Sequence, residues 1–184
     1  MLLSTRRAAA AAACLLAVAG CNADPAEPSP SPVRTVRPSP PETSIERQQR
    51  LDFEAAEKSY RTFIAEKNRL GMQGGASEAS SVMKATAAGP YLDFYVALLR
   101  EQKATGKRYT SGTKIGYVNR GPYAPDQLTL LVCEDGSSNR VLDKNGKQIG
   151  SGTIQRRALF VRPIDGAWKM WDGEEQGEVK TCEN

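Results

Sequence analysis

Side chains that could transfer a proton are scarce, because the 184-residue sequence contains no histidine. Histidine is the commonest general base and the commonest protein ligand for metals. Most carboxylates lie in segments expected to form turns. Asp93 is the exception, because it lies beside Phe94 and Tyr95 in an expected helix, and a buried acid there could act as a base. The helix dipole also favours an acid early in a helix, and this is the simpler explanation of Asp93.

Aromatic residues supply the candidate pocket. Small-molecule sites combine large apolar side chains with a few polar groups. With Asp93, the predicted pocket set is Tyr60, Phe63, Tyr95 and Trp168. Core packing between helices and a sheet is the simpler explanation of the same aromatic residues. Arg156 and Arg157 could bind an anion, although strand alternation would turn one of them outward.

Other chemical signatures are missing from the sequence. No serine or threonine has a neighbouring base to activate it, and no glycine-rich loop has the spacing of a phosphate cradle. We therefore predict no catalytic residues, no metal site and no cofactor.

Residues 1–21 have the layout of a secretory signal. Arg6 and Arg7 precede a small apolar run, Ala8–Gly20, which ends at Cys21. As a helix, this run would span about 20 Å, against roughly 30 Å for the hydrocarbon core of a bilayer. A permanent transmembrane helix is therefore not expected.

The quartet Val18-Ala19-Gly20-Cys21 resembles the lipobox of bacterial lipoproteins. In that family the cysteine thiol is diacylglycerylated, and the cysteine becomes the first residue after cleavage. The resemblance implies a signal peptide at residues 1–20, a lipid anchor on Cys21 and a location at the extracytoplasmic face of the cell membrane. An ordinary secretory signal with an unrelated cysteine is the alternative, and the sequence leaves open Sec or twin-arginine export.

If Cys21 is acylated, the mature chain keeps two further cysteines, Cys133 and Cys182. An even pair outside the cytoplasm is typical of a disulfide. The bond would close a loop of about fifty residues and contribute roughly 4 kcal/mol in the chain-entropy model. The close C-x-x-C spacing of a redox site is absent.

The segment 21–43 is predicted to be a lipidated cysteine followed by a disordered stalk. Its prolines favour extended polyproline II backbone, and it has little apolar surface to bury. Removal of residues 1–20 would take away Arg6 and Arg7 and lower the net charge from +4 to +2. Such a weakly basic, exported chain is not expected to bind nucleic acid.

Helical periodicity dominates the first part of the remaining chain. Thr43 and Glu46 have the spacing of a capping box. Apolar residues then recur at spacings of three and four through Ser44–Leu70, which predicts an amphipathic helix. A shorter helix is expected at Ser77–Ala87, and a third at Tyr91–Ala104.

After Lys107 the apolar spacing changes to two, which predicts strands. Asn-Gly and Asp-Gly dipeptides mark tight turns between them. Helices followed by an antiparallel meander predict one α+β domain over residues 44–184, with the helices packed on one sheet face. The expected strands are Tyr109–Val118, Gln127–Cys133, Arg140–Asp143, Gln148–Ile149, Thr153–Arg162, Trp168–Trp171 and Val179–Cys182.

This order of elements resembles the nuclear transport factor 2-like (SnoaL-like) cone fold. Residues 160–170 are similar to the penultimate hairpin of that superfamily, in which an apolar strand, an Asp-Gly turn and a tryptophan-containing strand recur. The resemblance implies a curved sheet closed on one side by helices, with a pocket at the open end. The chain also resembles small lipoproteins of high-GC Gram-positive bacteria, on Tyr60-Arg61-Thr62-Phe63, Cys133-Glu134-Asp135 and the C-terminal Cys182.

Together these features predict a membrane-anchored extracytoplasmic lipoprotein that binds a protein or small ligand without catalysis. A cone-fold enzyme of the isomerase or cyclase type, with Asp93 as its base, is one alternative. An assembly or superinfection-exclusion factor is another. The expected partners are the membrane, through Cys21, and an unknown protein or small molecule.

Overall fold

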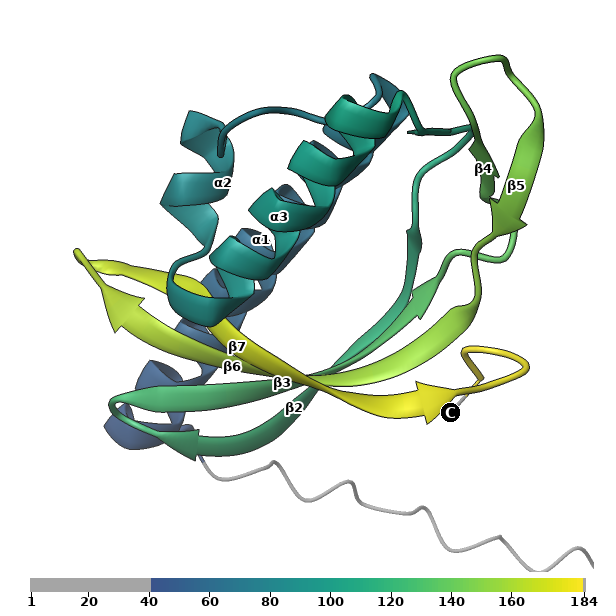
Figure 1. The fold of residues 1–184 in the computed structure, drawn as a ribbon. Coiled ribbons are helices and arrows are strands. Elements are labelled where there is room, and N and C mark those ends of the chain that lie inside the picture. The colour runs from purple at the N-terminus through teal and green to yellow at the C-terminus, as the bar shows by residue number, and fades with distance from the viewer. Residues whose placement is uncertain (1–40, 184) are drawn as a thin grey trace, which may run out of the picture. The chain divides into compact units, whose positions relative to one another are not determined.

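The helices of the described residues lie together on one face of a curved sheet (Figure 1). The computed structural model describes residues 41–183. Within this range α1 (Ser44–Met72), α2 (Ser81–Thr86) and α3 (Gly89–Thr105) precede all the strands. The prediction of an α+β fold, with helices packed on an antiparallel sheet, is confirmed.

The larger sheet has four antiparallel strands in the order β2-β3-β6-β7. Its strands are β2 (Lys114–Ala124), β3 (Gln127–Asp135), β6 (Ile154–Ile164) and β7 (Ala167–Glu178). The register shifts twice between β2 and β3 and twice between β6 and β7. Such irregularities bend a strand and increase its twist, and Figure 1 shows the sheet curving beneath the helices.

A second sheet, in the order β1-β4-β5, stands at one end of the larger one. It consists of β1 (Arg108–Tyr109), β4 (Arg140–Leu142) and β5 (Gln148–Ser151). The prediction of one strand over Tyr109–Val118 is wrong, because this segment is divided between the two sheets. Asn68 explains the break: its side-chain amide donates to the Thr113 carbonyl and accepts from the Thr113 N–H, both at 2.9 Å.

The predicted final strand, Val179–Cys182, is also wrong. β7 runs through the predicted segment Trp168–Trp171 as far as Glu178, and the chain then leaves the sheet. A disulfide joins Cys182 to Cys133 on β3, with Cα atoms 5.6 Å apart, so the predicted pairing is confirmed. Gly116 on β2 permits this packing, because a Cβ at that position would collide with the Cys182 side chain.

Local capping sets the helix starts. The Glu46 N–H donates to the Thr43 hydroxyl at 3.2 Å, and the Thr43 N–H donates to the Glu46 carboxylate at 2.8 Å. The predicted capping box is thus confirmed, although α1 extends beyond the predicted Leu70. α2 is shorter than the predicted Ser77–Ala87, because it begins only after Ser80, whose hydroxyl caps the helix.

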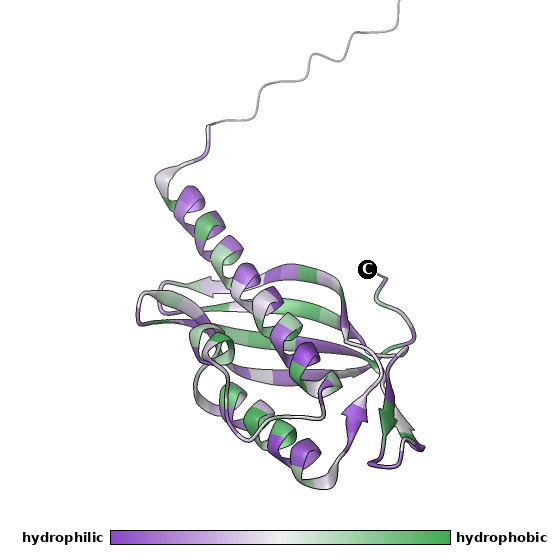
Figure 2. Ribbon diagram, turned by 90° about the horizontal axis from the view of Figure 1, so that it is seen from above, coloured by the Kyte–Doolittle hydropathy of each residue, from purple (hydrophilic) through white to green (hydrophobic). Residues whose placement is uncertain are grey.

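The hydrophobic core lies between the three helices and the larger sheet. Figure 2 shows hydrophobic residues along the central strands beneath the helices. The largest fully buried side chains include Tyr60 and Phe63 of α1, Met83 of α2, and Leu128, Leu130, Leu159 and Met170 of the sheet. Burying one such side chain contributes roughly 1.5–3 kcal/mol, so this layer holds α1 in a defined orientation over the sheet.

The predicted signal peptide, the predicted lipid anchor on Cys21 and nearly all of the predicted stalk lie outside the described residues. Within 41–183, no helix is both long enough and apolar enough to cross a membrane.

Candidate functional site

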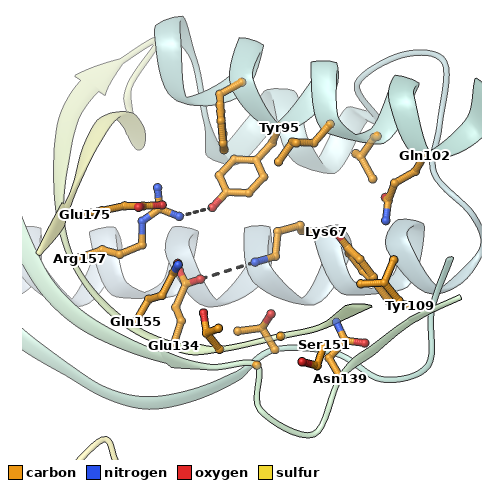
Figure 3. A pocket seen from close by; sticks show the side chains of 18 residues that line it. Lys67, Tyr95, Gln102, Tyr109, Glu134, Asn139, Ser151, Gln155, Arg157 and Glu175 are labelled. Atoms are coloured by element: carbon orange, nitrogen blue, oxygen red, sulfur yellow. Dashed lines mark hydrogen bonds and ion pairs between the residues drawn. The ribbon is translucent and has the colours of Figure 1, made fainter. Parts of the chain in front are cut away.

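A cavity of about 310 Å³ lies where the two sheets meet the helical layer. Its walls come from α1, α3, the small sheet and the adjoining ends of β3, β6 and β7 (Figure 3). The loops that contain Gly136 and Gly152 pack closely against each other in the cavity wall, and a Cβ at Gly152 would collide with the Gly136 carbonyl. The volume lies at the lower end of the range of small-molecule pockets, roughly 300–1,000 Å³.

Glu134 is the buried carboxylate of the cavity. Strand alternation places it on the same face of β3 as Leu130 and Val132, facing the helices. The side chain is only 7% exposed. Its Oε1 accepts a hydrogen bond from the Tyr60 hydroxyl at 3.0 Å, and its Oε2 lies 3.6 Å from the Lys67 ammonium. Both carboxylate oxygens therefore have partners on α1.

Lys67 projects from α1 into the middle of the cavity (Figure 3). It follows Tyr60 and Phe63 at spacings that keep all three on one helix face. Burial is the largest single influence on the Lys67 ammonium and acts to lower its pKa, but Glu134, Tyr95 and Tyr109 together outweigh it, so the net pKa lies above the usual value. The ammonium also lies 5.3 Å from the centre of the Tyr95 ring, within range of a cation–π interaction.

Arg157 brings a second positive charge. It shares the inward face of β6 with Leu159 and Val161, and it pairs in register with Val132 of β3 and Glu175 of β7. The guanidinium Nη1 donates to the Tyr95 hydroxyl at 2.6 Å. Burial acts to lower the pKa of Arg157, but Tyr95, Glu134, Tyr91 and Glu175 together outweigh it and raise the net value, so the group stays charged.

The α3 wall is apolar and ends in a buried amide. Phe94 and Leu98 are 51% and 37% exposed, so this wall reaches solvent, whereas Leu99 is buried. Gln102 follows Leu98 by four residues and is also buried. Its Nε2 has no hydrogen-bond partner. Figure 3 shows Gln102 and Arg157 at opposite ends of the cavity, with Lys67 between them.

The predicted pocket residues are only partly brought together. Tyr95 lines the cavity, whereas Tyr60 and Phe63 are fully buried in the core. Trp168 is not in the cavity wall, and its indole N–H donates to Asp52 at 3.1 Å.

Asp93 requires a correction, because it is exposed and does not line the cavity. Residues two apart on a helix point about 200° apart, so Tyr95 facing inward turns Asp93 toward solvent. The carboxylate on which the enzyme alternative rested is thus outside the site.

Of the main polar residues of the cavity, Lys67 and Glu134 were not predicted as site residues, and Arg157 was considered only as one of a pair that could bind an anion. Lys67, Glu134 and Arg157 each occupy a position where the local apolar period expects a core residue. That mismatch was visible in the sequence: Glu134 continues the series Leu128, Leu130, Val132. Of the arginine pair, it is Arg157 that faces the cavity.

No cluster of metal-ligating side chains is present within residues 41–183. The arrangement instead offers buried hydrogen-bond donors beside an apolar wall, which is the chemistry of a binding site for a small molecule.

Comparison with known proteins identifies the fold only. No family model and no curated protein matches the sequence. The intermembrane space region of the chloroplast protein ARC6 is similar in structure with a TM-score of 0.50 and 14% identity, over 67% of this chain and 95% of that one. A weaker likeness is to a nuclear transport factor 2-like protein with a cystatin-like fold from Novosphingobium aromaticivorans, with a TM-score of 0.42 and 16% identity, over 73% and 89%.

A protein of unknown function with a cystatin-like fold from Nostoc punctiforme has a TM-score of 0.34 and 14% identity, over 72% of this chain and 91% of that one. In this chain itself, a long helix, a short helix and a third helix precede a curved antiparallel sheet. This is the arrangement expected of the nuclear transport factor 2-like fold.

Proposed function

We propose that the chain is a membrane-anchored binding module whose cavity holds a small molecule. The observation that carries the proposal is a cavity whose wall contains two buried, unpartnered donors, Gln102 Nε2 and Arg157 Nε. Buried polar groups nearly always have partners, because leaving one unpaired costs about 1–3 kcal/mol. A bound molecule with acceptor atoms would supply those partners.

The partners of the buried Glu134 carboxylate favour binding over catalysis. A general base needs a free oxygen within hydrogen-bond reach of the proton it removes. In Glu134, Tyr60 occupies one oxygen and Lys67 faces the other. The carboxylate therefore acts in this proposal as a fixed counter-ion that positions Lys67.

The anchoring half of the proposal rests on the lipobox resemblance at Cys21. The Cys133–Cys182 disulfide supports it, because disulfides persist mainly outside the cytoplasm. The cavity would then face the extracytoplasmic space at the membrane surface.

A larger side chain at the mouth of the cavity should weaken binding. Leu98→Trp is expected to weaken binding of a neutral fluorescent dye, Nile red, at least tenfold, because the larger ring occupies the space beside α3. Leu51→Trp is the matched control, since Leu51 is similarly exposed, at 46%, and lies on α1 outside the cavity wall. Dye titration followed by fluorescence measures both. Equal loss in the two variants, or no loss in Leu98→Trp, would contradict the proposed use of the cavity.

Cys21→Ser is expected to release the chain from membranes, because serine cannot form the thioether to the lipid. Fractionation of cells into membrane and soluble parts, followed by immunoblotting, measures the distribution. Cys182→Ser serves as the control and should remain with the membranes, since Cys182 is expected to play no part in anchoring. A Cys21→Ser chain that still sediments with membranes would refute the lipid anchor.

A further inference from the structure

We infer that the cavity ligand is an apolar monocarboxylate that carries a second, uncharged oxygen acceptor. This inference rests on the proposed function, because it specifies what the same cavity binds. It follows from three features of the wall: its charge balance, the two unpartnered donors at its ends and the apolar surface between them.

The buried charges of the wall do not cancel. Lys67 and Arg157 are cationic and Glu134 is anionic, which leaves an excess of one positive charge among the buried lining groups. Glu175 faces Arg157 across the β6–β7 ladder and helps to raise its pKa, but the Glu175 side chain is exposed, so solvent weakens this attraction and Glu175 offsets the guanidinium charge only in part. A buried charge is stable only when it is paired. A single carboxylate on the ligand would complete the balance.

The carboxylate belongs at the Arg157 end of the cavity. Nη1 of Arg157 is committed to the Tyr95 hydroxyl, whereas Nε is buried with no partner. The Lys67 ammonium has three N–H donors, and its ion pair with Glu134 at 3.6 Å engages at most one of them, so it also retains capacity for an acceptor. Arginine and lysine together are the usual partners of carboxylates in proteins.

The other end of the cavity calls for a neutral acceptor. Five buried side-chain atoms among the described residues lack a hydrogen-bond partner, and the two that line the cavity, Arg157 Nε and Gln102 Nε2, are both donors. Gln102 is only 6% exposed, so water does not readily serve its amide. Figure 3 labels no cation beside Gln102 at its end of the cavity. A ketone or hydroxyl oxygen of the ligand therefore suits the Gln102 amide better than a second carboxylate.

The ligand's middle should be apolar. Phe94, Leu98 and Leu99 form the α3 side of the cavity between the two ends. A volume of about 310 Å³ suits one compact molecule and is small for a lipid with two acyl chains.

Three matched probes test the inference on the full chain in detergent, with detergent-only titrations subtracted. 4-Benzoylbutyrate carries both acceptors, 4-benzoylbutyramide lacks the charge and 5-phenylvalerate lacks the ketone. Calorimetric titration should show benzoylbutyrate binding at least tenfold tighter than its amide and roughly threefold tighter than phenylvalerate, as expected for a charged and a neutral hydrogen bond. The side-chain amide resonances of Gln102 should shift with benzoylbutyrate and not with phenylvalerate.

Gln102→Leu separates the two ends of the site. It should remove the preference for the ketone and leave the preference for the carboxylate over the amide unchanged, because Arg157 and Lys67 are intact. Equal affinity for benzoylbutyrate and its amide would overturn the carboxylate assignment. Failure of all three probes would also overturn it, and the proposed function would still stand if Leu98→Trp selectively blocked Nile red.

Discussion

Loss of the Cys133–Cys182 disulfide is expected to lower the free energy of unfolding by roughly 4 kcal/mol, as the chain-entropy model gives for a loop of this size. The two cysteines are 49 residues apart in sequence. The closed loop contains β4, β5, β6 and β7, so the reduced unfolded chain gains freedom over the whole C-terminal half of the fold. Cys182→Ala tests this with least disturbance, because it leaves the buried Cys133 side chain in place.

Urea unfolding of the oxidised protein, Cys182→Ala and Thr181→Ala provides the measurement. Thr181 is the exposed neighbour of Cys182, and its substitution should shift stability by less than about 0.5 kcal/mol. Peptide mapping by mass spectrometry should recover the two cysteines as one cross-linked pair. Cys182→Ala unfolding at the same urea concentration as Thr181→Ala would show that the bond contributes no stability.

Lys67→Met is expected to destabilise the fold by about 3–5 kcal/mol, because it leaves the buried Glu134 carboxylate without its cation. Methionine retains the length and most of the volume of lysine, so lost packing contributes little. Since the folded-state pKa of Lys67 is raised, the contribution of its charge is fully present below the ordinary lysine value of 10.5 and is lost as pH rises through the higher folded-state value.

A double-mutant cycle distinguishes the ion pair from a general loss of charge. Lys58→Met removes an exposed lysine from the same helix and should change stability by less than about 0.5 kcal/mol. Lys67→Met combined with Glu134→Gln should recover most of the loss, because no unpaired charge then remains buried. If Lys67→Met matched Lys58→Met in urea, Lys67 and Glu134 would not form a stabilising pair.

The pocket prediction was wrong for Asp93 and correct for Tyr95, and the orientation of α3 explains both outcomes. Both residues were chosen by their types and by their proximity in the chain, but only one face of α3 meets the sheet. The apolar positions Tyr91, Tyr95 and Leu99 define that face, and Asp93 lies opposite to it. Helical phase was therefore more informative than residue type.

Comparing each charged residue with the apolar period of its own helix or strand would have found the cavity residues. Lys67, Glu134 and Arg157 are charged residues at positions of α1, β3 and β6 where the pattern calls for apolar ones. A charged residue on an apolar face must either be paired or line a cavity, because isolated burial is too costly. The sequence shows three charged residues at apolar positions, but it does not show that they line the same cavity.

Short-range patterns were enough to predict the helices, most strands and the capping box, because each depends on residues a few positions apart. The cysteine count predicted the disulfide once residues 1–20 were assigned to a signal peptide and Cys21 to the lipid anchor. Only the tertiary structure decided that Tyr95 meets Arg157 and that Tyr60 meets Glu134, across 62 and 74 residues of chain. Those contacts depend on how α1 and α3 cross the sheet, on its bulges and on the division of the strands between two sheets. They arise from packing of the whole domain, which no local pattern encodes.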